Sequence, residues 1–331
     1  MAINPQRILV TGGSGFIGTN LITAFLQQGH IVCNLDIGAP LDPVHAALRR
    51  SCDILDASGL HAALQDFAPD AVIHLAARTD CVENVDVHTA YRVNIEGTQN
   101  LLSASASCQS VKRWILASSQ YVIGPEKKPA SLDDYGPHTV YGQSKVMAEQ
   151  AVKSGDWPFT WTIARLTNIW GPWHLRYRRE AWEVIRRGRY LHPGWEPVIR
   201  CYGYVGNIVH YLCRLLTLDS GIVNRQTFYL GDPPIDIYEW VNAFSLELRG
   251  KPARRVPRFA VRLIALAGDC LAAAGQSFPI TSSRYRSMTQ DYLTPMDRTF
   301  AVLGPPPVPL REGVKQTVAW LKDYGFPDQA G

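Results

Sequence analysis

A parallel β-sheet covered by helices on both faces is the fold class that the sequence predicts. Over the first two-thirds of the chain, short apolar runs rich in β-branched residues alternate with longer stretches of helical periodicity. A glycine-rich turn joins the first apolar run to the first helical stretch. Alternation of this kind produces βαβ units, and therefore a doubly wound α/β sheet of the Rossmann type.

The strands and helices follow one another in the order that this fold requires. Strands are expected at residues 7–11, 31–36, 71–76, 114–118 and 159–166, and helices at 15–28, 91–105 and 141–154. After residue 168 clear strands become rare, and Trp, Arg, Gly and Pro accumulate. We therefore expect a first domain over residues 1–168, to which parts of 200–235 return, and a smaller, mostly C-terminal α/β lobe over 169–331.

Composition narrows the class of protein. The 331 residues are 46% hydrophobic and 19% charged, and the net charge of +4 is too small to indicate a nucleic-acid partner. Neither a membrane-spanning run nor a signal peptide is recognisable, so a cytoplasmic protein is expected. The seven cysteines are scattered and form no Cys-x-x-Cys pair, which disfavours both a disulfide framework and a metal site.

The glycine-rich turn is typical of a phosphate cradle. It reads Thr11-Gly12-Gly13-Ser14-Gly15-Phe16-Ile17-Gly18 and lies between a strand and a helix. Side chains at its glycines would block the tight turn and the approach of a pyrophosphate. The helix N-terminus offers amide groups and a partial positive charge to the phosphates. The turn therefore predicts that the first domain binds a dinucleotide.

An acid at the end of the second strand specifies the dinucleotide. Asp36 stands eighteen residues after Gly18, where a carboxylate accepts hydrogen bonds from the adenosine ribose and repels a 2′-phosphate. No Arg or Lys occurs within residues 37–40 to hold such a phosphate. NAD is thus favoured over NADP.

A tyrosine and a lysine form the candidate proton-transfer pair. Tyr141 and Lys145 are four residues apart at the start of a predicted helix and so share a face. A neighbouring ammonium stabilises phenolate and lowers the pKa of the phenol toward neutrality. Ser118 and Ser119 end the preceding strand at the carboxyl edge of the sheet, where a hydroxyl is able to orient a substrate oxygen.

With these motifs the chain resembles the extended short-chain dehydrogenase/reductase family, in its nucleotide-sugar epimerase/dehydratase group. The resemblance implies that Ser119, Tyr141 and Lys145 form the catalytic triad. It also implies cofactor contacts, which by their match to the family's motifs are Gly12, Gly15, Phe16, Ile17, Gly18, Asp36, Asp53, Ile54, Leu75, Ala76, Ala77, Asn94, Ser118, Tyr141 and Lys145. Asn94 is similar to the residue that bends a helix in the family.

Differences from the family's patterns narrow the reaction. Dehydratases of the group carry Thr-Asp-Glu where this chain has Ser119-Gln120-Tyr121, so the acid and base for expelling water are missing and dehydration is not expected. Epimerases usually carry Val-Tyr-Gly where this chain has Val122-Ile123-Gly124. The leading hypothesis is an NAD-dependent epimerase of a nucleotide-diphosphate sugar, with a 4-epimerase as the expected type.

The smaller lobe supplies the candidate substrate contacts. By resemblance, Asn168 and Arg200 contact the substrate diphosphate, although the usual Asp after the second of these stands here as Asn207. Eight arginines between positions 165 and 200 and six nearby tryptophans suit a diphosphate and a base or sugar ring, and from these we add Arg176, with Arg178 as its alternative. The expected ligand is a UDP-, dTDP- or GDP-sugar, and related enzymes are commonly homodimers.

Other functions stay open at this point. The segments Phe278-Pro279-Ile280-Thr281 and Asp297-Arg298-Thr299-Phe300 resemble 3β-hydroxysteroid dehydrogenases, which use the same Ser, Tyr and Lys on apolar alcohols. A dehydrogenase of a sugar nucleotide and a non-catalytic dinucleotide sensor are further alternatives. Residues 256–275 are apolar and are expected to form a buried helix, with a membrane-contacting helix or a lid as the alternatives.

Overall fold

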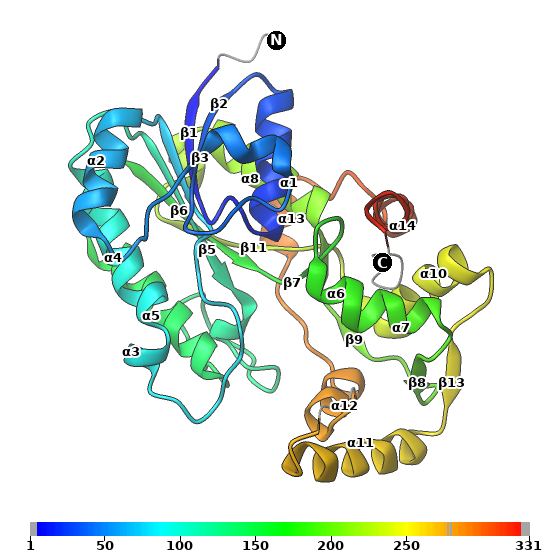
Figure 1. Cartoon of the computed structure of the whole chain (residues 1–331). Helices are drawn as coiled ribbons and strands as arrows, with labels where there is room; N and C mark the ends of the chain where they lie inside the picture. Colours follow the sequence, from blue (N-terminus) through cyan, green and yellow to red (C-terminus); the bar gives the residue numbers. More distant parts are fainter. Residues whose placement is uncertain (1–4, 277, 279, 326–331) are drawn as a thin grey trace. The chain divides into compact units, whose positions relative to one another are not determined.

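The structure is a computed structural model that describes residues 5–325 except 277 and 279 (Figure 1). Within this range the chain divides into two compact units. The first contains the chain up to Thr167 together with Val205–Gly231 and Pro295–Pro306, and the second contains Asn168–Tyr204, Asp232–Thr294 and the residues from Pro307 onward. Each unit is described by itself.

The first unit is built on a seven-stranded parallel sheet, which confirms the predicted fold class. Its order is β11-β6-β5-β4-β1-β2-β3. Strand β1 lies between β2 and β4, so the chain leaves it in one direction and later returns on its other side; ligands of such sheets bind where the order reverses. The strands are β1 Arg7–Thr11, β2 Ile31–Leu35, β3 Arg49–Arg50, β4 Ala71–His74, β5 Arg113–Ser119, β6 Thr160–Leu166 and β11 Gln226–Leu230.

Helices cover both faces of this sheet (Figure 1). On one face α2 (Ala57–Phe67), α4 (Arg92–Ala106) and α5 (Val140–Ser154) pack side by side, and on the other α1 (Phe16–Gln27) packs against α8 (Val205–Thr217). Helix α13 (Asp297–Leu303) contacts β11 and α8. The shorter helices are η1 Pro43–Leu48, α3 Val87–Ala90, η2 Gln120–Val122 and α9 Ser220–Val223.

The predicted elements of the first unit are present, with ends that differ by one or two residues. Strand β4 ends at His74. The Leu75 amide still donates to the Thr11 carbonyl of β1 (3.0 Å), but the Ala76 amide donates to the Thr11 hydroxyl (3.3 Å) instead of a backbone carbonyl. The helix expected at 91–105 begins at Arg92, and Tyr91 separates it from the short α3. Strand β3 was not predicted, because it has only two residues. Helices α2 and α8 and strand β11 were not predicted by their bounds either.

The second unit combines short strand pairs with helices around an aromatic core. Trp170, Trp182 and Phe244 are fully buried there, with ring centroids of neighbouring pairs 5.4–5.6 Å apart. The strand pairs are β7 (Asn168–Trp170) with β10 (Tyr202–Tyr204), β9 (Ile199–Arg200) with β12 (Ile235–Asp236), and β8 (Leu191–Pro193) with β13 (Arg254–Val256). The helices are α6 Leu175–Tyr177, η3 Arg178–Trp182, α7 Glu183–Arg186, α10 Ile237–Arg249, α11 Arg258–Ala273, α12 Ser282–Thr289 and α14 Leu310–Tyr324.

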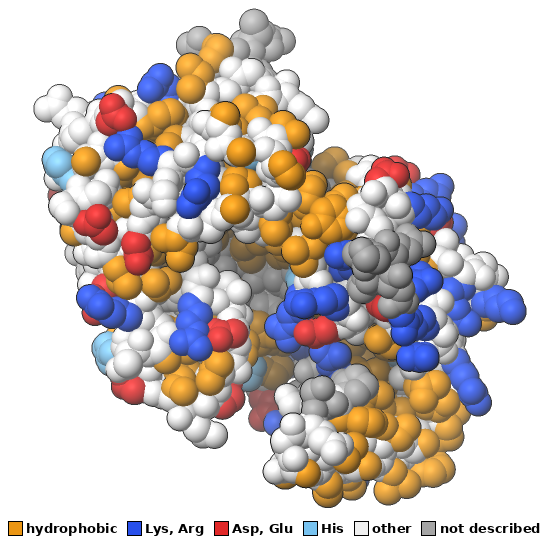
Figure 2. Space-filling view, in the orientation of Figure 1, with side chains coloured by type: hydrophobic (Ala, Val, Ile, Leu, Met, Phe, Trp, Pro, Cys, Tyr) orange, Lys and Arg blue, Asp and Glu red, His pale blue; other side chains and the backbone are white. Residues whose placement is uncertain are grey.

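Helix α11 corrects one prediction. Residues 256–275 were expected to form a buried helix, but only Val261, Ala265 and Gly268 of α11 are buried. Apolar side chains on its other side are exposed, and hydrophobic atoms gather over this helix at the lower edge of Figure 2. The composition of the helix is apolar on both sides, so sequence alone did not separate the packed side from the exposed one. Among the described residues no helix is long and apolar enough to cross a membrane.

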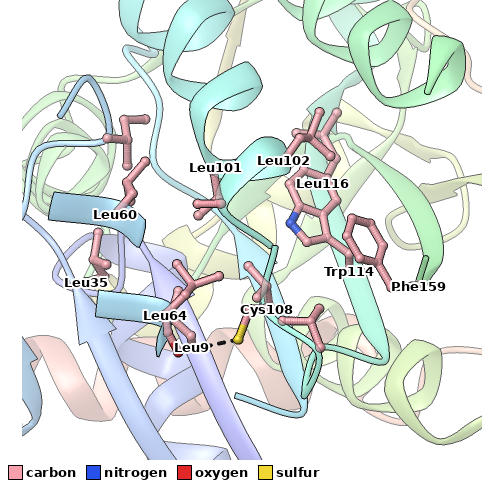
Figure 3. Close-up of a cluster of buried hydrophobic side chains, with 14 of the residues drawn as sticks. Leu9, Leu35, Leu60, Leu64, Leu101, Leu102, Cys108, Trp114, Leu116 and Phe159 are labelled. Carbon is pink, nitrogen blue, oxygen red and sulfur yellow. Dashed lines mark hydrogen bonds between the residues drawn. The ribbon is translucent and has the colours of Figure 1, made fainter. Parts of the chain in front are cut away.

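A large apolar cluster packs the sheet of the first unit against α2, α4 and α5. Figure 3 shows Trp114 of β5 beside Leu102 of α4 and Phe159, which precedes β6. The rings of Trp114 and Phe159 are stacked, with centroids 6.3 Å apart. Cys108 is buried as a thiol whose sulfur contacts the Leu64 carbonyl at 3.5 Å. The described cysteines are all free.

Helix α5 is tied to the sheet by a buried ion pair. The carboxylate of Glu149 accepts hydrogen bonds from Arg165 of β6 at 2.8 Å (Nε) and 2.7 Å (Nη2), and both side chains are 0% exposed. The same carboxylate accepts the hydroxyls of Ser118 (2.5 Å) and Tyr135 (2.8 Å). Arg165 also donates to Tyr229 of β11 at 3.0 Å. We call Glu149, Arg165, Ser118, Tyr135 and Tyr229 the anchor network.

The anchor network shifts the titration of its members. Burial alone would lower the pKa of Arg165, but the hydrogen bonds and the charge of Glu149 raise it above its usual range. Burial and the adjacent Glu149 carboxylate raise the pKa of the Tyr135 phenol. The Arg165 guanidinium therefore stays charged and the Tyr135 phenol stays protonated, and both contact the Glu149 carboxylate. A buried ion pair needs such partners.

We expect the anchor network to dominate the attachment of α5. Glu149→Gln keeps the shape of the side chain but leaves the Arg165 charge buried without its counter-charge, so the free energy of unfolding should fall by about 3–5 kcal/mol. Urea denaturation measures this loss. Glu96→Gln is the matched control, because it breaks the exposed Arg92–Glu96 pair of α4, which contributes less than about 1 kcal/mol. Equal losses in the two variants would contradict the assignment.

Candidate active site

The glycine-rich turn lies at the junction of β1 and β4, where the order of the sheet reverses. Gly12 has a φ of +70°, and a Cβ there would approach the Ala76 nitrogen to 2.6 Å. A Cβ at Gly18 would lie 2.5 Å from the Gly12 carbonyl oxygen. Neither position accommodates a side chain, so only glycine allows this tight turn and its close packing on the loop after β4 and on the start of α1.

Helix α1 begins directly after this turn. Gly15 is its N-cap residue and provides no capping side chain, and the first turn of the helix carries no acidic residue. The positive end of the helix dipole is therefore not neutralised by this part of the described chain. Gly15, Phe16, Ile17 and Gly18, predicted from sequence, thus form the start of a helix suited to bind a diphosphate.

Asp36 follows the last residue of β2. One of its carboxylate oxygens accepts the Ser14 amide at 3.0 Å, and the other accepts the Gly38 amide at 2.8 Å. These bonds fix the carboxylate beside the glycine-rich turn, and each oxygen keeps a lone pair for a ribose hydroxyl. The geometry fits the predicted contact with an adenosine ribose.

Arg49 is a residue of this edge that the sequence did not reveal. Strand β3 pairs with β2, and this pairing brings the Arg49 guanidinium to the carbonyls of Asp36 (3.3 Å) and Ile37 (2.7 Å). Residues 37–40 contain no cation. The cation at this edge comes from β3, which is adjacent to Asp36 only in the fold. The guanidinium is held by backbone oxygens and by the Ser51 hydroxyl at 3.1 Å.

The other predicted cofactor contacts lie in the loops that follow β3 and β4. Asp53 accepts the Leu55 amide at 2.9 Å, and Asn100 of α4 donates to the Ile54 carbonyl at 3.2 Å. Leu75 and Ala76 form the wall against which Gly12 packs, and Ala77 follows them. All of these residues stay predictions as cofactor contacts.

Asn94 connects three elements around the same edge. Its side chain accepts the Arg78 amide at 2.8 Å and donates to the Arg78 carbonyl at 3.0 Å and to the Ser144 hydroxyl at 2.9 Å. The loop after β4 is thereby joined to α4 and α5. The geometry indicates that Asn94 positions this loop beside the break at Tyr91 between α3 and α4.

Ser119, Tyr141 and Lys145 are brought together at the carboxyl end of β5 and the first turns of α5. The Ser119 side chain hydrogen bonds the Tyr141 phenol and accepts the Tyr121 amide at 3.2 Å. Lys145 donates to the Ala117 carbonyl at 2.9 Å. All three side chains are almost fully buried. The Ser118 hydroxyl points elsewhere and belongs to the anchor network. Ser118 as a cofactor contact stays a prediction.

The pKa of Tyr141 differs from the expectation drawn from the sequence. Burial raises the pKa of Tyr141 above its usual value, and the hydrogen bond from Ser119 opposes this shift. The predicted lowering by Lys145 is not the dominant effect in this structure. Burial lowers the pKa of Lys145 to about 8, and Glu149 opposes that shift. Sequence spacing placed the two groups on one helix face but did not reveal how deeply both are buried.

His74 completes the polar interior beneath the site. Its ring nitrogens contact the hydroxyls of Thr11 (2.7 Å) and Thr98 (3.0 Å). Burial lowers the pKa of His74 to about 3, and the nearby Lys145 charge adds to this effect. The imidazole is therefore neutral at physiological pH and joins β1, β4 and α4 rather than carrying charge.

The predicted substrate contacts lie in the second unit and engage separate partners. Asn168 begins β7. Arg176 pairs with Glu180 at 3.2 Å on the surface, whereas Arg200 donates to the Ser287 carbonyl at 2.5 Å and lies over the Tyr292 ring. Arg178 donates to the Gly325 carbonyl at 2.9 Å. Arg165, counted among the candidate arginines, belongs to the anchor network. The roles of Asn168, Arg176 and Arg200 toward substrate stay predictions.

The chain is similar to a known protein family and to several known enzymes. The chain matches the model of the NAD dependent epimerase/dehydratase family over residues 8–231. It is 32% identical over 278 residues to a 3β-hydroxysteroid dehydrogenase/Δ5→4-isomerase of Mycobacterium tuberculosis, covering 78% of this chain and 74% of the relative. It is 28% identical over 295 residues to an N-acetyl-α-D-glucosaminyl-diphospho-ditrans,octacis-undecaprenol 4-epimerase of Escherichia coli O157:H7, covering 85% of each.

A solved structure of similar fold is the UDP-glucose 4-epimerase of Thermotoga maritima with UDP-glucose. The TM-score is 0.72 at 22% identity, and the match covers 96% of this chain and 99% of that one. At this identity the likeness concerns the fold.

We expect Gly12→Ala to abolish useful cofactor binding. The added methyl group would collide with the backbone at Ala76, so the Kd for NAD, measured by calorimetry, should rise by about 100-fold or more. Gly29→Ala is the control: Gly29 has a similar φ of +80°, but nothing lies within 4 Å of an added Cβ. Both variants carry about 1–2 kcal/mol of backbone strain, so only the collision distinguishes them. Unchanged NAD affinity in Gly12→Ala would argue against the cradle.

The lowered pKa of Lys145 predicts a pH-dependent stability. Between the folded value of about 8 and the usual value of 10.5, the unfolded chain binds this proton more tightly than the folded chain does. Stability from this group therefore rises as the pH increases through that window. Denaturant unfolding from pH 7.5 to 10 should show the wild type gaining stability relative to Lys145→Met. Parallel profiles for the two proteins would show that Lys145 keeps an ordinary pKa.

Proposed function

The chain belongs to the NAD-dependent epimerase/dehydratase family, and from that premise we propose that it is an NAD-dependent epimerase of a nucleotide-diphosphate sugar. Its homologues include both sugar epimerases and 3β-hydroxysteroid dehydrogenases. The family confirms the prediction of NAD as cofactor. The specific reaction and substrate are the proposal.

The hydrogen bond between Ser119 and Tyr141, with Lys145 bound to the adjacent Ala117 carbonyl, is the observation that carries this proposal. A hydroxyl, a phenol and an amine at the carboxyl edge of a dinucleotide fold are the groups needed to handle the proton of a secondary alcohol. NAD, when bound, supplies the acceptor and later the donor of hydride.

Ser119, Tyr141 and Lys145 each have a separate role in proton transfer. The Ser119 hydroxyl orients the substrate oxygen, and the Tyr141 oxygen takes the proton of the substrate hydroxyl and returns it at the end of the cycle. The Lys145 ammonium lies one helical turn away and favours the ionised phenol. The buried surroundings of Tyr141, which include the rings of Tyr91 and Tyr121 at 6.2 and 6.1 Å, exclude water from the proton path.

The two residues that follow Ser119 argue against a dehydration reaction. Positions 120 and 121 are Gln and Tyr, neither of which carries the carboxyl group that expels or activates water in the family's dehydratases. Gln120 is buried, and the Tyr121 ring lies 5.3 Å from the His138 ring. An epimerase needs no acid or base beyond Ser119, Tyr141 and Lys145, so the sequence departure at 120–121 is consistent with epimerisation.

We propose that the protein binds its substrate through a diphosphate group. Asn168, Arg200 and Arg176 of the second unit are the residues that we propose for it, because guanidinium and amide groups match phosphate oxygens. A UDP-, dTDP- or GDP-sugar supplies this diphosphate.

The second candidate is a dehydrogenase of a 3β-hydroxysteroid-like alcohol. It is favoured by the 32% identity to the mycobacterial 3β-hydroxysteroid dehydrogenase/Δ5→4-isomerase. Ser119, Tyr141 and Lys145 would act on such an alcohol in the same way, and NAD would then be exchanged after each turnover.

We expect Tyr141→Phe to lower turnover by about 10²–10⁴-fold with little change in NAD affinity, because only the proton-transferring oxygen is removed. Tyr324→Phe, which changes an exposed tyrosine of α14, should keep full activity. The measurement is mass spectrometry of products after incubation with NAD and a panel of UDP-, dTDP- and GDP-sugars and a 3β-hydroxysteroid.

The panel separates the candidate functions. A new isomer of unchanged mass supports the epimerase, and loss of two hydrogens selects the dehydrogenase. Loss of water would contradict the interpretation of Gln120 and Tyr121. NAD binding without turnover of any substrate would favour the non-catalytic sensor.

A further inference from the structure

The exposed side of α11 is an apolar stripe. Phe259, Leu263 and Leu266 are 68%, 63% and 49% exposed, and Cys270 is exposed in line with them. Their spacing of four, three and four residues places them on one side of the helix. Single exposed apolar residues are ordinary, but a continuous row along about three turns indicates a surface that binds something.

The opposite side of α11 is already packed. Gly268 lies so close to the chain at Ile280 that an added Cβ would approach the Ile280 carbonyl oxygen to 2.0 Å. Val261 and Ala265 are fully buried, and α11 contacts β8 and α12. The helix is thus fixed to the second unit through one side, and the apolar stripe faces outward.

Positive charge borders this stripe. Residues 248–268 contain six basic residues and no acidic one, and the basic ones are Arg249, Lys251, Arg254, Arg255, Arg258 and Arg262. Lys251, Arg254 and Arg262 are exposed. Arg258 and Arg262 are one turn apart along one edge of the stripe. Figure 2 shows Lys and Arg side chains gathered on the same unit.

The acidic groups near α11 have defined partners. Glu196 pairs with Arg258 at 2.8 Å, and Asp269 accepts the Ser282 amide at 3.0 Å. The exposed Trp195 belongs to the same surface, because its carbonyl accepts Arg255 at 3.2 Å. The surface therefore combines an aromatic residue, an apolar stripe and a net positive border.

We propose that α11 binds peripherally to the surface of a bilayer that contains anionic phospholipids. Phe259, Leu263 and Leu266 enter the boundary between headgroups and acyl chains, while Arg254 and Arg262 stay at the level of the lipid phosphates. This combination of an apolar face, basic residues and an indole is the pattern of helices that lie in a membrane interface. Charge selects the bilayer over a second copy of this chain, whose α11 would carry the same positive border.

The test is co-sedimentation of the full-length protein with vesicles. We expect binding to vesicles of phosphatidylcholine with phosphatidylglycerol, weaker binding to pure phosphatidylcholine, and weakening by added salt. Replacing both Arg254 and Arg262 by Gln should lower the partition coefficient by about 25-fold, at about fivefold per charge. Leu263→Glu should abolish binding.

Ile222→Glu is the matched control, since it adds the same charge at an exposed apolar residue of α9 in the first unit. This control should bind vesicles like the wild type. NAD binding by each variant verifies folding, and the double Arg variant keeps the test valid if Leu263→Glu fails to fold. Absence of vesicle binding, or equal binding to neutral and anionic vesicles, would overturn the proposal. So would a Leu263→Glu variant that turns a dimer into a monomer in light scattering while vesicles bind neither protein.

Discussion

The site depends on the buried ion pair between Glu149 and Arg165. Helix α5 carries Tyr141, Lys145 and Glu149 at intervals of four residues, so the three side chains share one face of the helix. The ion pair fixes the far end of this face to β6, and the Ser118 hydroxyl connects it to β5 immediately before Ser119. The position of the phenol relative to Ser119 is thus determined by contacts two helical turns away. Burial lowers the pKa of Lys145, and the same carboxylate opposes that shift, so the anchor network helps the Lys145 amine to keep its charge.

The second constraint is the contact between β1 and β4. Gly12 approaches the backbone of Ala76 at the point where the order of the sheet reverses. Asp36 and Asn94 fix the neighbouring loops, and His74 joins β1, β4 and α4. Both constraints act at the carboxyl edge of one sheet. The cofactor cradle and the candidate catalytic groups therefore belong to one rigid framework, which is the preorganisation that proton transfer requires.

Sequence alone predicted the parts of this framework that depend on local chemistry. The glycine spacing, the strand-end position of Asp36 and the four-residue interval from Tyr141 to Lys145 are properties of adjacent residues. The anchor network was missed because Glu149 and Arg165 meet only after α5 packs on β6, and a lone Glu in a helix resembles a surface residue. Arg49 was missed because a two-residue strand carries no periodic signal. Burial of the phenol, which raises its pKa, and the exposed side of α11 likewise depend on tertiary packing.

The most direct test of the account is a crystal structure of the protein with NAD. In that structure we expect the dinucleotide over Gly12 and Gly18, with the Tyr141 oxygen facing the nicotinamide ring and still hydrogen bonded to Ser119, and with the Glu149–Arg165 pair intact. A nicotinamide ring bound far from residue 141, or a phenol that has left Ser119, would contradict it.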